Sequence, residues 1–363
     1  MKIIEVILSL TNGGGERFVV DLCNEMSQTQ DVTLLVLKSF DIQNNGFYKN
    51  EVNDKVKIIN LGFKDGFSLT YLIKIISAIN NINPDIVHIH GAADKYCLPI
   101  MAFHPSKRLV IQTIHNDIKS SYCDTLHKFI IGFLGKLNRV KFVTISKKNH
   151  EDFSLYYPDI SNELIYNGRA PLSKSPQYEI VKKEIISMKK DESTSVLLHI
   201  GRCDIQKNQI LLIKAFNSWI KTGANAILLI CGSGFDSDLG KKLKMESKDN
   251  IFYIGSKQNV VDYLLCCDAF VLSSSYEGMP ITVLEAMSLK VPVLSTPVCG
   301  VVDVIENGKN GYISNDFTEE SFVGMLQEFG KNFSEIKERC KKNESNRFSI
   351  SRCAESYLDL FRN

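Results

Sequence analysis

Two glutamates eight positions apart could contact one ligand. Glu277 follows an apolar run, 269–272, that predicts a buried strand, and Glu285 lies about one turn into a helix expected over 281–289. Pro280 suits the first turn of that helix, because its missing N–H costs nothing there. The amides and dipole of a helix N-terminus favour an anion. The stretch could therefore hold a molecule with hydroxyl groups at both ends and a phosphate between them, as in a nucleotide sugar.

Taken alone, the two glutamates are more often a surface residue before a helix and a solvated residue within it. A pair of cations upstream changes this balance. Arg202 ends a strand expected over 195–200, and Lys207 precedes a helix. Arg makes bidentate contacts with phosphate and Lys acts as a point charge, so the pair suits a diphosphate. Two solvated loop cations would be the alternative.

A glycine loop, 13–15, joins a strand expected over 3–10 to a helix that opens at Glu16. This layout lets backbone amides approach a phosphate or a sugar, although a tight turn explains the glycines equally well. It is not the dinucleotide fingerprint, since position 18 is Phe and no acidic residue ends the next strand, 32–37. A nicotinamide-dependent enzyme is therefore disfavoured.

Three histidines fall at or near strand ends. His88 and His90 share one face of a strand expected over 86–90, and His115 follows the strand 109–114. A metal could use the first two, but no carboxylate or Cys is seen to complete a site. Asp236-Ser237-Asp238, which resembles a metal-binding carboxylate pair, follows a glycine turn and is interpreted as a helix cap. We therefore expect no metal, a structural His88 and a functional His115.

The elements that must position these residues alternate between strand and helix. Further strands are expected over 56–60, 141–145, 163–166, 226–231, 251–254 and 291–295. Such alternation predicts an α/β fold with parallel sheets covered by helices on both faces. Ligands then lie beyond the carboxyl ends of the strands.

A chain of 363 residues favours two domains. We predict a first domain over 1–170, a polar linker over 171–193 and a second domain over 194–345. The amphipathic tail, 346–363, is expected to pack back onto the first domain.

The composition is that of an ordinary globular protein, with 44% hydrophobic and 23% charged residues. A net charge of +2 gives no case for nucleic acid. Ten scattered cysteines without a CxxC spacing, no visible secretory signal and no apolar stretch near membrane-spanning length predict a cytoplasmic protein with reduced thiols.

Between Lys107 and Lys148 the sequence has nine basic residues against two acids, Asp117 and Asp124. The same segment carries an apolar stripe: Tyr122, Leu126, Phe129, Ile130, Phe133, Leu134 and Leu137. Such a helix could lie on an anionic membrane surface, or face the core with a solvated basic side, and the two readings are equally favoured.

A series of motifs in fixed order resembles one family: GGGER, HIHG, TIHND, TIS, NGR, GRCDIQKN, CGSG and YEGMPITVLEAM. Together, over nearly the whole chain, they are similar to the retaining nucleotide-sugar glycosyltransferases of family 4, which have the GT-B fold. The resemblance implies two facing Rossmann-like domains, with the donor held mainly by the second. It implies no metal cofactor.

The same resemblance assigns roles to residues. His115, Arg202, Lys207 and Glu277 would be catalytic. The donor would be bound by Gly14, Gly15, Gly201, Arg202, Lys207, Gly234, Lys257, Glu277, Gly278, Met279, Pro280, Ile281 and Glu285. Among these, Glu285 would take the ribose hydroxyls and 255–257 the base. His90 and Asn116 are assigned to the acceptor.

By this resemblance the protein would move a sugar from a UDP-hexose or UDP-N-acetylhexosamine to a glycan or lipid-linked glycan in surface polysaccharide biosynthesis. It would act in the cytoplasm or on the inner face of the cell membrane. Two alternatives stay open: a GT-B nucleotide-sugar 2-epimerase, and a non-catalytic protein that binds sugar nucleotides.

Overall fold

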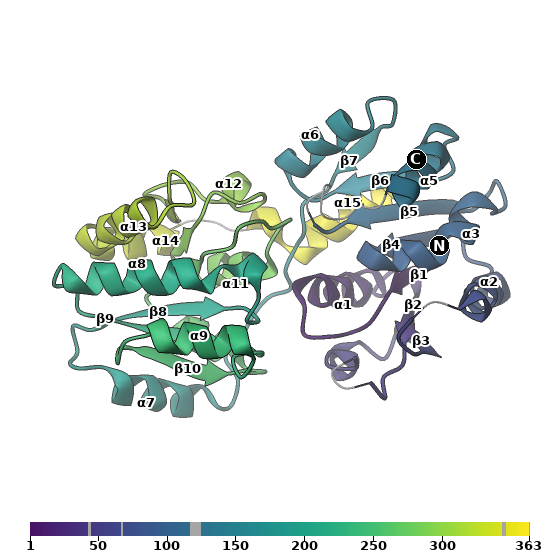
Figure 1. The fold of residues 1–363 in the computed structure, drawn as a ribbon. Coiled ribbons are helices and arrows are strands. Elements are labelled where there is room, and N and C mark those ends of the chain that lie inside the picture. Colours follow the sequence, from purple (N-terminus) through teal and green to yellow (C-terminus); the bar gives the residue numbers. More distant parts are fainter. Residues whose placement is uncertain (43–44, 67, 117–124, 343–345, 363) are drawn as a thin grey trace. The chain divides into compact units, whose positions relative to one another are not determined.

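The computed structural model describes all residues except 43–44, 67, 117–124, 343–345 and 363. The predicted features Asp117, Lys119, Tyr122 and Asp124 lie outside the described residues. The chain divides into two compact units. Unit 1 comprises Met1–Ala170 and Arg347–Asn363, and unit 2 comprises Pro171–Asn346 (Figure 1).

Unit 1 is built on a seven-stranded parallel sheet with the order β3-β2-β1-β4-β5-β6-β7. Its strands are β1 (Lys2–Ile7), β2 (Asp31–Lys38), β3 (Lys57–Phe63), β4 (Ile86–His90), β5 (Leu109–Ile114), β6 (Lys141–Thr144) and β7 (Asn162–Leu164). The central strands are almost wholly buried, as expected for a sheet covered on both faces. Its helices are α1 (Gly14–Met26), α2 (Leu69–Ile82), α3 (Asp94–Ala102), α5 (Thr125–Lys136), α6 (Lys147–Tyr156) and α15 (Ile350–Arg362).

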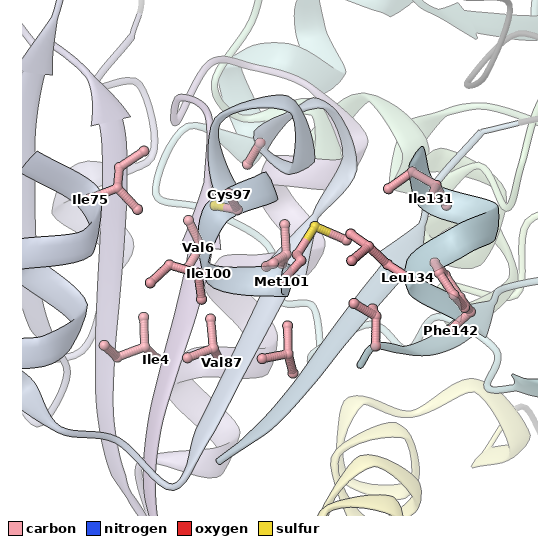
Figure 2. Close-up of a cluster of buried hydrophobic side chains, with 14 of the residues drawn as sticks. Ile4, Val6, Ile75, Val87, Cys97, Ile100, Met101, Ile131, Leu134 and Phe142 are labelled. Carbon is pink, nitrogen blue, oxygen red and sulfur yellow. The ribbon is translucent and has the colours of Figure 1, made fainter. Parts of the chain in front are cut away.

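Strand alternation sends the side chains of β1 to opposite faces of the sheet. Ile4 and Val6 join a core formed with α2, α3 and α5, in which Ile131 and Leu134 of α5 point inward (Figure 2). On the opposite face lie α1 and α15, which pack on each other. That second face carries the polar group described below.

Helix α15 belongs to unit 1 because the chain returns there after unit 2. Tyr357 is fully buried, and Ser351 Oγ donates to Glu25 Oε1 of α1 at 2.6 Å. The start of α15 passes close to the end of the first part of unit 1: a Cβ at Gly168 would lie 2.7 Å from Ile350 Cα. The apolar face of the tail thus covers one face of the first sheet.

Unit 2 has a six-stranded parallel sheet with the order β10-β9-β8-β11-β12-β13. Its strands are β8 (Ser195–Ile200), β9 (Ala226–Cys231), β10 (Ile251–Gly255), β11 (Ala269–Leu272), β12 (Val293–Ser295) and β13 (Gly311–Ile313). Its helices are α7 (Tyr178–Met188), α8 (Gln209–Lys221), α9 (Asp238–Glu246), α10 (Val260–Cys266), α11 (Ile281–Ser288), α12 (Val301–Val304), α13 (Glu319–Lys331) and α14 (Phe333–Lys342). One face of this sheet forms a core with α8, α9, α13 and α14.

The segment interpreted as a linker, 171–193, is folded onto unit 2. It contains α7, in which Val181 and Ile185 are buried. Tyr263 of α10 donates a hydrogen bond to Glu184 Oε2 at 2.9 Å. The alternating charges of this segment therefore belong to the solvent face of a packed helix.

Across the described residues, no helix combines the length and the apolar character that crossing a membrane requires.

Candidate functional site

The site in unit 2 is built on β8 and β11, neighbouring strands at the point where the strand order reverses. In open parallel sheets, ligands bind beyond the carboxyl ends of such strands. The loop after β8 carries Gly201, Arg202 and the short 3-10 helix η3 (Ile205–Lys207). The loop after β11 leads into α11. These are the two loops that the sequence marks.

Three hydrogen bonds to backbone carbonyls hold the two loops together. Ser273 Oγ donates to the carbonyl of Lys207 at 2.8 Å, and the amide of Ser275 donates to the carbonyl of Gln206 at 2.8 Å. Gln206 Nε2 donates to the carbonyl of Tyr276 at 3.0 Å. Residues about 70 positions apart in sequence are thus held side by side.

Glu277 is clamped through one of its two carboxylate oxygens. Lys207 Nζ and Ser274 Oγ both donate to Oε1 at 2.6 Å. The two charged side chains are mostly buried, 18% exposed for Lys207 and 8% for Glu277. Glu277 Oε2 has no hydrogen-bond partner among the described residues. The arrangement leaves one oriented carboxylate oxygen, and two of the three Lys207 donors, for a ligand.

Arg202 is the exposed cation of this site. Its Nε donates to Asp204 Oδ2 at 3.0 Å, and its side chain is 63% exposed. The terminal guanidinium nitrogens have no partner in the part of the chain that the structure describes. Such a fork could bind two oxygens of a phosphate.

Close backbone contacts shape the base of the site. A Cβ on Gly232, at the end of β9, would clash with the Gly201 carbonyl, and a Cβ on Gly300 would lie 2.8 Å from Met279 Cα. Gly234 has a positive φ of 85°, which glycine adopts without strain, and it abuts Cys203. Larger residues at these glycines would push the loops apart.

Helix α11 starts at Ile281, with Pro280 as its N-cap residue. Gly278, Met279, Pro280 and Ile281 are all buried, and Glu285 on the first turns of α11 is 5% exposed. Lys257 lies against Tyr263 of α10. Its Nζ lies 5.4 Å from the centre of the Tyr263 ring, and a hydrogen bond with Tyr263 raises the pKa of Lys257. No hydrogen bond joins it to Lys207 or Glu277 within the described residues.

Unit 1 brings together a second predicted group. His90 Nδ1 lies 2.9 Å from His115 Nε2, and His90 Nε2 lies 2.6 Å from Glu5 Oε2. Gly15 lies beside His115, since a Cβ there would be 4.0 Å from its Cγ, and Gly14 is the first residue of α1. Asn116, which follows His115 in the loop after β5, is exposed. Both ring nitrogens of His90 have partners in this structure, and the residue is 2% exposed. The role in acceptor binding that the resemblance assigns to His90 and Asn116 stays a prediction.

Glu5 was not among the predicted site residues. It lies opposite His88 in the parallel pairing of β1 and β4, and its Oε2 is 2.8 Å from His88 Nδ1. The expectation that no carboxylate accompanies the histidines is therefore wrong. The available signal was an acidic residue inside an otherwise apolar strand, which is rarely buried without a partner.

The electrostatics of this group follow from burial. Burial alone would raise the pKa of Glu5, but the adjacent imidazoles outweigh it and lower that pKa to about 2. Burial lowers the pKa of His90 to about 4, and burial also holds the pKa of His115 well below its usual value. Glu5 is thus an ionised carboxylate that contacts the largely neutral imidazole of His90.

Two groups of side chains in the structure bear on whether the protein could bind a metal. Ser237 caps α9, since its Oγ accepts from the amide of Gly240 at 3.2 Å, so the interpretation of Asp236-Ser237-Asp238 as a helix cap is confirmed. Glu5, His88 and His90 each offer a ligand atom, all within 4.8 Å of one another, and could hold a metal. In this structure the same atoms contact each other, with both imidazoles on one carboxylate oxygen.

Comparison with known proteins identifies the family of both units. Residues 12–169 match the family model described as Glycosyltransferase Family 4, and residues 181–347 match Glycosyl transferases group 1. An uncharacterised glycosyltransferase of Methanocaldococcus jannaschii is 28% identical over 77% of each chain. The UDP-Gal:alpha-D-GlcNAc-diphosphoundecaprenol alpha-1,3-galactosyltransferase of Escherichia coli is 23% identical over 80% of this chain and 78% of its own.

Among solved structures, Anabaena HepE in complex with UDP and glucose has a TM-score of 0.81. It covers 100% of this chain and 99% of its own at 15% sequence identity, a likeness of fold. The two family models together cover both units, and each unit has the parallel sheet that this fold requires. The chain therefore belongs to the group 1, family 4 glycosyltransferases and has the GT-B fold.

Proposed function

We propose that this glycosyltransferase moves a sugar, with retention of anomeric configuration, from a UDP-hexose or UDP-N-acetylhexosamine to a glycan or lipid-linked glycan. The observation that carries the proposal is the Lys207–Glu277 pair, 2.6 Å apart at the ends of β8 and β11, with the Arg202 guanidinium exposed on the same loop. Cations and a carboxylate so joined suit a molecule with both a diphosphate and sugar hydroxyls. The similar galactosyltransferase of Escherichia coli, whose name gives a UDP-sugar donor and a diphosphoundecaprenol acceptor, supports these substrate classes.

In the proposed reaction, the bond between the anomeric carbon and the phosphate oxygen breaks while a bond to the acceptor oxygen forms on the same face. The leaving diphosphate gains negative charge, which Lys207 and Arg202 stabilise without reorganising. The acceptor proton passes to the leaving phosphate oxygen, so no further base is needed. Glu277 orients the sugar through Oε2 and is not assigned as a nucleophile.

The remaining donor contacts are those that the family resemblance implies. Glu285, on the first turns of α11, would take the ribose hydroxyls, and the backbone of 278–281 would approach the sugar and the phosphates. The Gly14–Gly15 backbone and His115 of unit 1 would contact the phosphates and the sugar. The loop 255–257 would face the base.

The purified protein, incubated with a panel of labelled nucleotide sugars and a lipid-linked glycan, tests the proposal. A transferase consumes the donor rapidly only when acceptor is present, and the product should keep the anomeric configuration of the donor sugar by NMR. Epimerised donor without an acceptor would point to a 2-epimerase. Binding without conversion would point to a non-catalytic sugar-nucleotide-binding protein.

Helix α5 supplies a membrane-docking surface in this proposal. Leu126, Phe129 and Phe133, with Leu137 just after the helix, recur at helical spacing and are 53–69% exposed. The opposite side, with Ile131 and Leu134, is buried in the core (Figure 2). Helix α5 therefore presents apolar side chains to solvent within a segment rich in basic residues, as expected for contact with anionic lipids.

The double substitution Phe129→Ser and Phe133→Ser should weaken binding to vesicles that contain phosphatidylglycerol by at least about tenfold, because each lost Phe contributes about 1.5 kcal/mol or more when buried. Co-sedimentation with vesicles measures this. The double variant Ile180→Ser and Ile186→Ser, which removes exposed apolar residues 67% and 57% exposed on α7, is the control. Equal loss in both, or none in the first, would contradict docking through α5.

Transfer should proceed at an unchanged rate in excess EDTA. Lys207 and Arg202 supply the positive charge that a divalent cation would otherwise provide to the diphosphate. Initial rates with and without chelator measure this, and a loss of activity that added Mg²⁺, Mn²⁺ or Zn²⁺ restores would overturn it.

A further inference from the structure

A chain of hydrogen bonds crosses three strands of unit 1 and ends at His115. Glu5 on β1, His90 on β4 and His115 just after β5 contact one another in sequence, at 2.6 Å and 2.9 Å. The pairing of β1 with β4 and of β4 with β5 places them on one face of the sheet. Phe18 of α1 lies edge-on to the His115 ring, with ring centroids 5.5 Å apart. Two members of this hydrogen-bonded series therefore lie on strands, and Phe18 of α1 packs on the third, His115.

The polarity of this chain follows from its first member. An ionised carboxylate only accepts hydrogen bonds, so His90 Nε2 must carry a proton. His90 is buried and neutral, which leaves its Nδ1 as an acceptor. His115 Nε2, which faces that nitrogen, must then be the donor. Because His115 is also neutral, its own Nδ1 carries no proton.

We infer that Glu5 and His90 are positioning residues that hold His115 in the Nε2–H tautomer, with a bare Nδ1 that accepts a hydrogen bond from a ligand hydroxyl. The Nδ1 atom is buried and has no donor among the described residues, which a polar atom in a protein interior rarely tolerates. A phosphate oxygen would not satisfy it, since both atoms are acceptors. On the proposed function, the group that completes this chain is a sugar hydroxyl of the donor.

A second branch of the same network leads away from His115. Glu5 Oε2 is also 2.8 Å from His88 Nδ1, and His88 Nε2 is 2.7 Å from Thr113 Oγ1. Thr113 Oγ1 is in turn 2.9 Å from the hydroxyl of Tyr357 on α15. Tyr357→Phe therefore removes a buried hydrogen bond of this network without touching the branch that sets His115.

Nitrogen NMR of the full-length protein with labelled histidine tests the inference without requiring activity. The chain has seven histidines, and the spectrum of His115→Gln identifies the His115 signals. With EDTA present, wild-type His115 should show a protonated Nε2 and an unprotonated Nδ1. A protonated Nδ1, or a doubly protonated ring, would overturn the assignment.

Glu5→Gln tests the role of the carboxylate, because Gln can donate as well as accept and so no longer fixes the direction of the chain. The two His115 nitrogen shifts should move toward each other in Glu5→Gln and stay at the wild-type values in Tyr357→Phe. If Glu5→Gln does not fold, His90→Gln is the substitute. Unchanged His115 shifts in the folded variant would show that Glu5 and His90 do not set the tautomer.

Transfer assays separate this inference from the function on which it rests. If the protein transfers sugar, Glu5→Gln should lower kcat more than it raises KM, and Tyr357→Phe should leave both near wild type. If wild type transfers no sugar while the tautomer is as expected, the proposed function fails and the positioning roles stand. If it transfers sugar with a protonated Nδ1, the function stands and the inference fails.

Discussion

Glu277→Gln is expected to lower kcat/KM for sugar transfer by about 100-fold, since hydrogen bonds to a charged group contribute about 1.5–3 kcal/mol. The substitution keeps the shape of the side chain, and the Gln oxygen can still accept from Lys207 and Ser274, which lie 2.6 Å from Oε1. What it removes is the negative charge that orients the sugar hydroxyl and balances Lys207. The protein should therefore remain folded while transfer is lost.

Initial rates with saturating acceptor, together with the Tm of each variant, measure this effect. A matched control exists on the surface: Glu306 pairs with Lys309 at 2.5 Å, with both side chains about two-thirds exposed. Glu306→Gln should leave transfer and Tm unchanged, because exposed pairs contribute little. If folded Glu277→Gln transferred sugar at the wild-type rate, the role of the Glu277 carboxylate in orienting the donor sugar would be contradicted.

Lys207→Met should weaken binding of a nucleoside diphosphate by about 30-fold, as expected for losing one charge-assisted contact worth about 2 kcal/mol. Arg202→Ala should weaken it less, by about tenfold, because its more exposed charge is better screened by solvent. Isothermal titration calorimetry with UDP gives both values. Affinities equal to wild type in both variants would contradict the diphosphate assignment.

A loss of folding stability in Lys207→Met could also lower its affinity for UDP, because removing Lys207 leaves the mostly buried Glu277 without its counter-charge. The double variant Lys207→Met with Glu277→Gln removes both charges, so its Tm should lie closer to wild type than that of Lys207→Met. Its affinity for UDP should stay low. Lys309→Met, which removes the cation of the exposed pair, should change neither quantity.

Much of the fold could be predicted from the sequence, because strands buried on both faces leave an unbroken apolar run. The expected bounds of β4, β5, β8, β9 and β11 agree with the structure to the residue. The predicted bounds of shorter strands were less accurate: β12 was expected from 291 and begins at Val293. At strand ends the pattern weakens, since turn residues and edge residues are both mixed in polarity.

Contacts within the sites were harder to predict than the residues that make them. Lys207 and Glu277 were assigned to different parts of the donor, yet the structure pairs them, because their contact depends on two loops packing about 70 residues apart. Glu5 was missed for the same reason: its partners lie on β4, which joins β1 only in the folded sheet. The spacing of residues along the sequence does not show which strands and loops will be neighbours in the fold.

Helix α5 shows a different limit. Its sequence is apolar nearly all round, so periodicity could not decide between a core-facing and a membrane-facing stripe. The structure divides the stripe: Leu134 is 4% exposed, whereas Phe129 is 69% exposed. Only the position of the neighbouring helices decides which side of an apolar helix is covered.

A crystal structure of the protein with a UDP-sugar would show whether Lys207, Arg202, Glu277 and Glu285 hold the donor. We expect diphosphate oxygens within about 2.7–2.9 Å of Lys207 Nζ and the Arg202 guanidinium, as usual for charge-assisted contacts. We also expect a sugar hydroxyl on Glu277 Oε2 and the ribose on Glu285. A nucleotide bound elsewhere on the protein, with these four side chains untouched, would contradict this assignment.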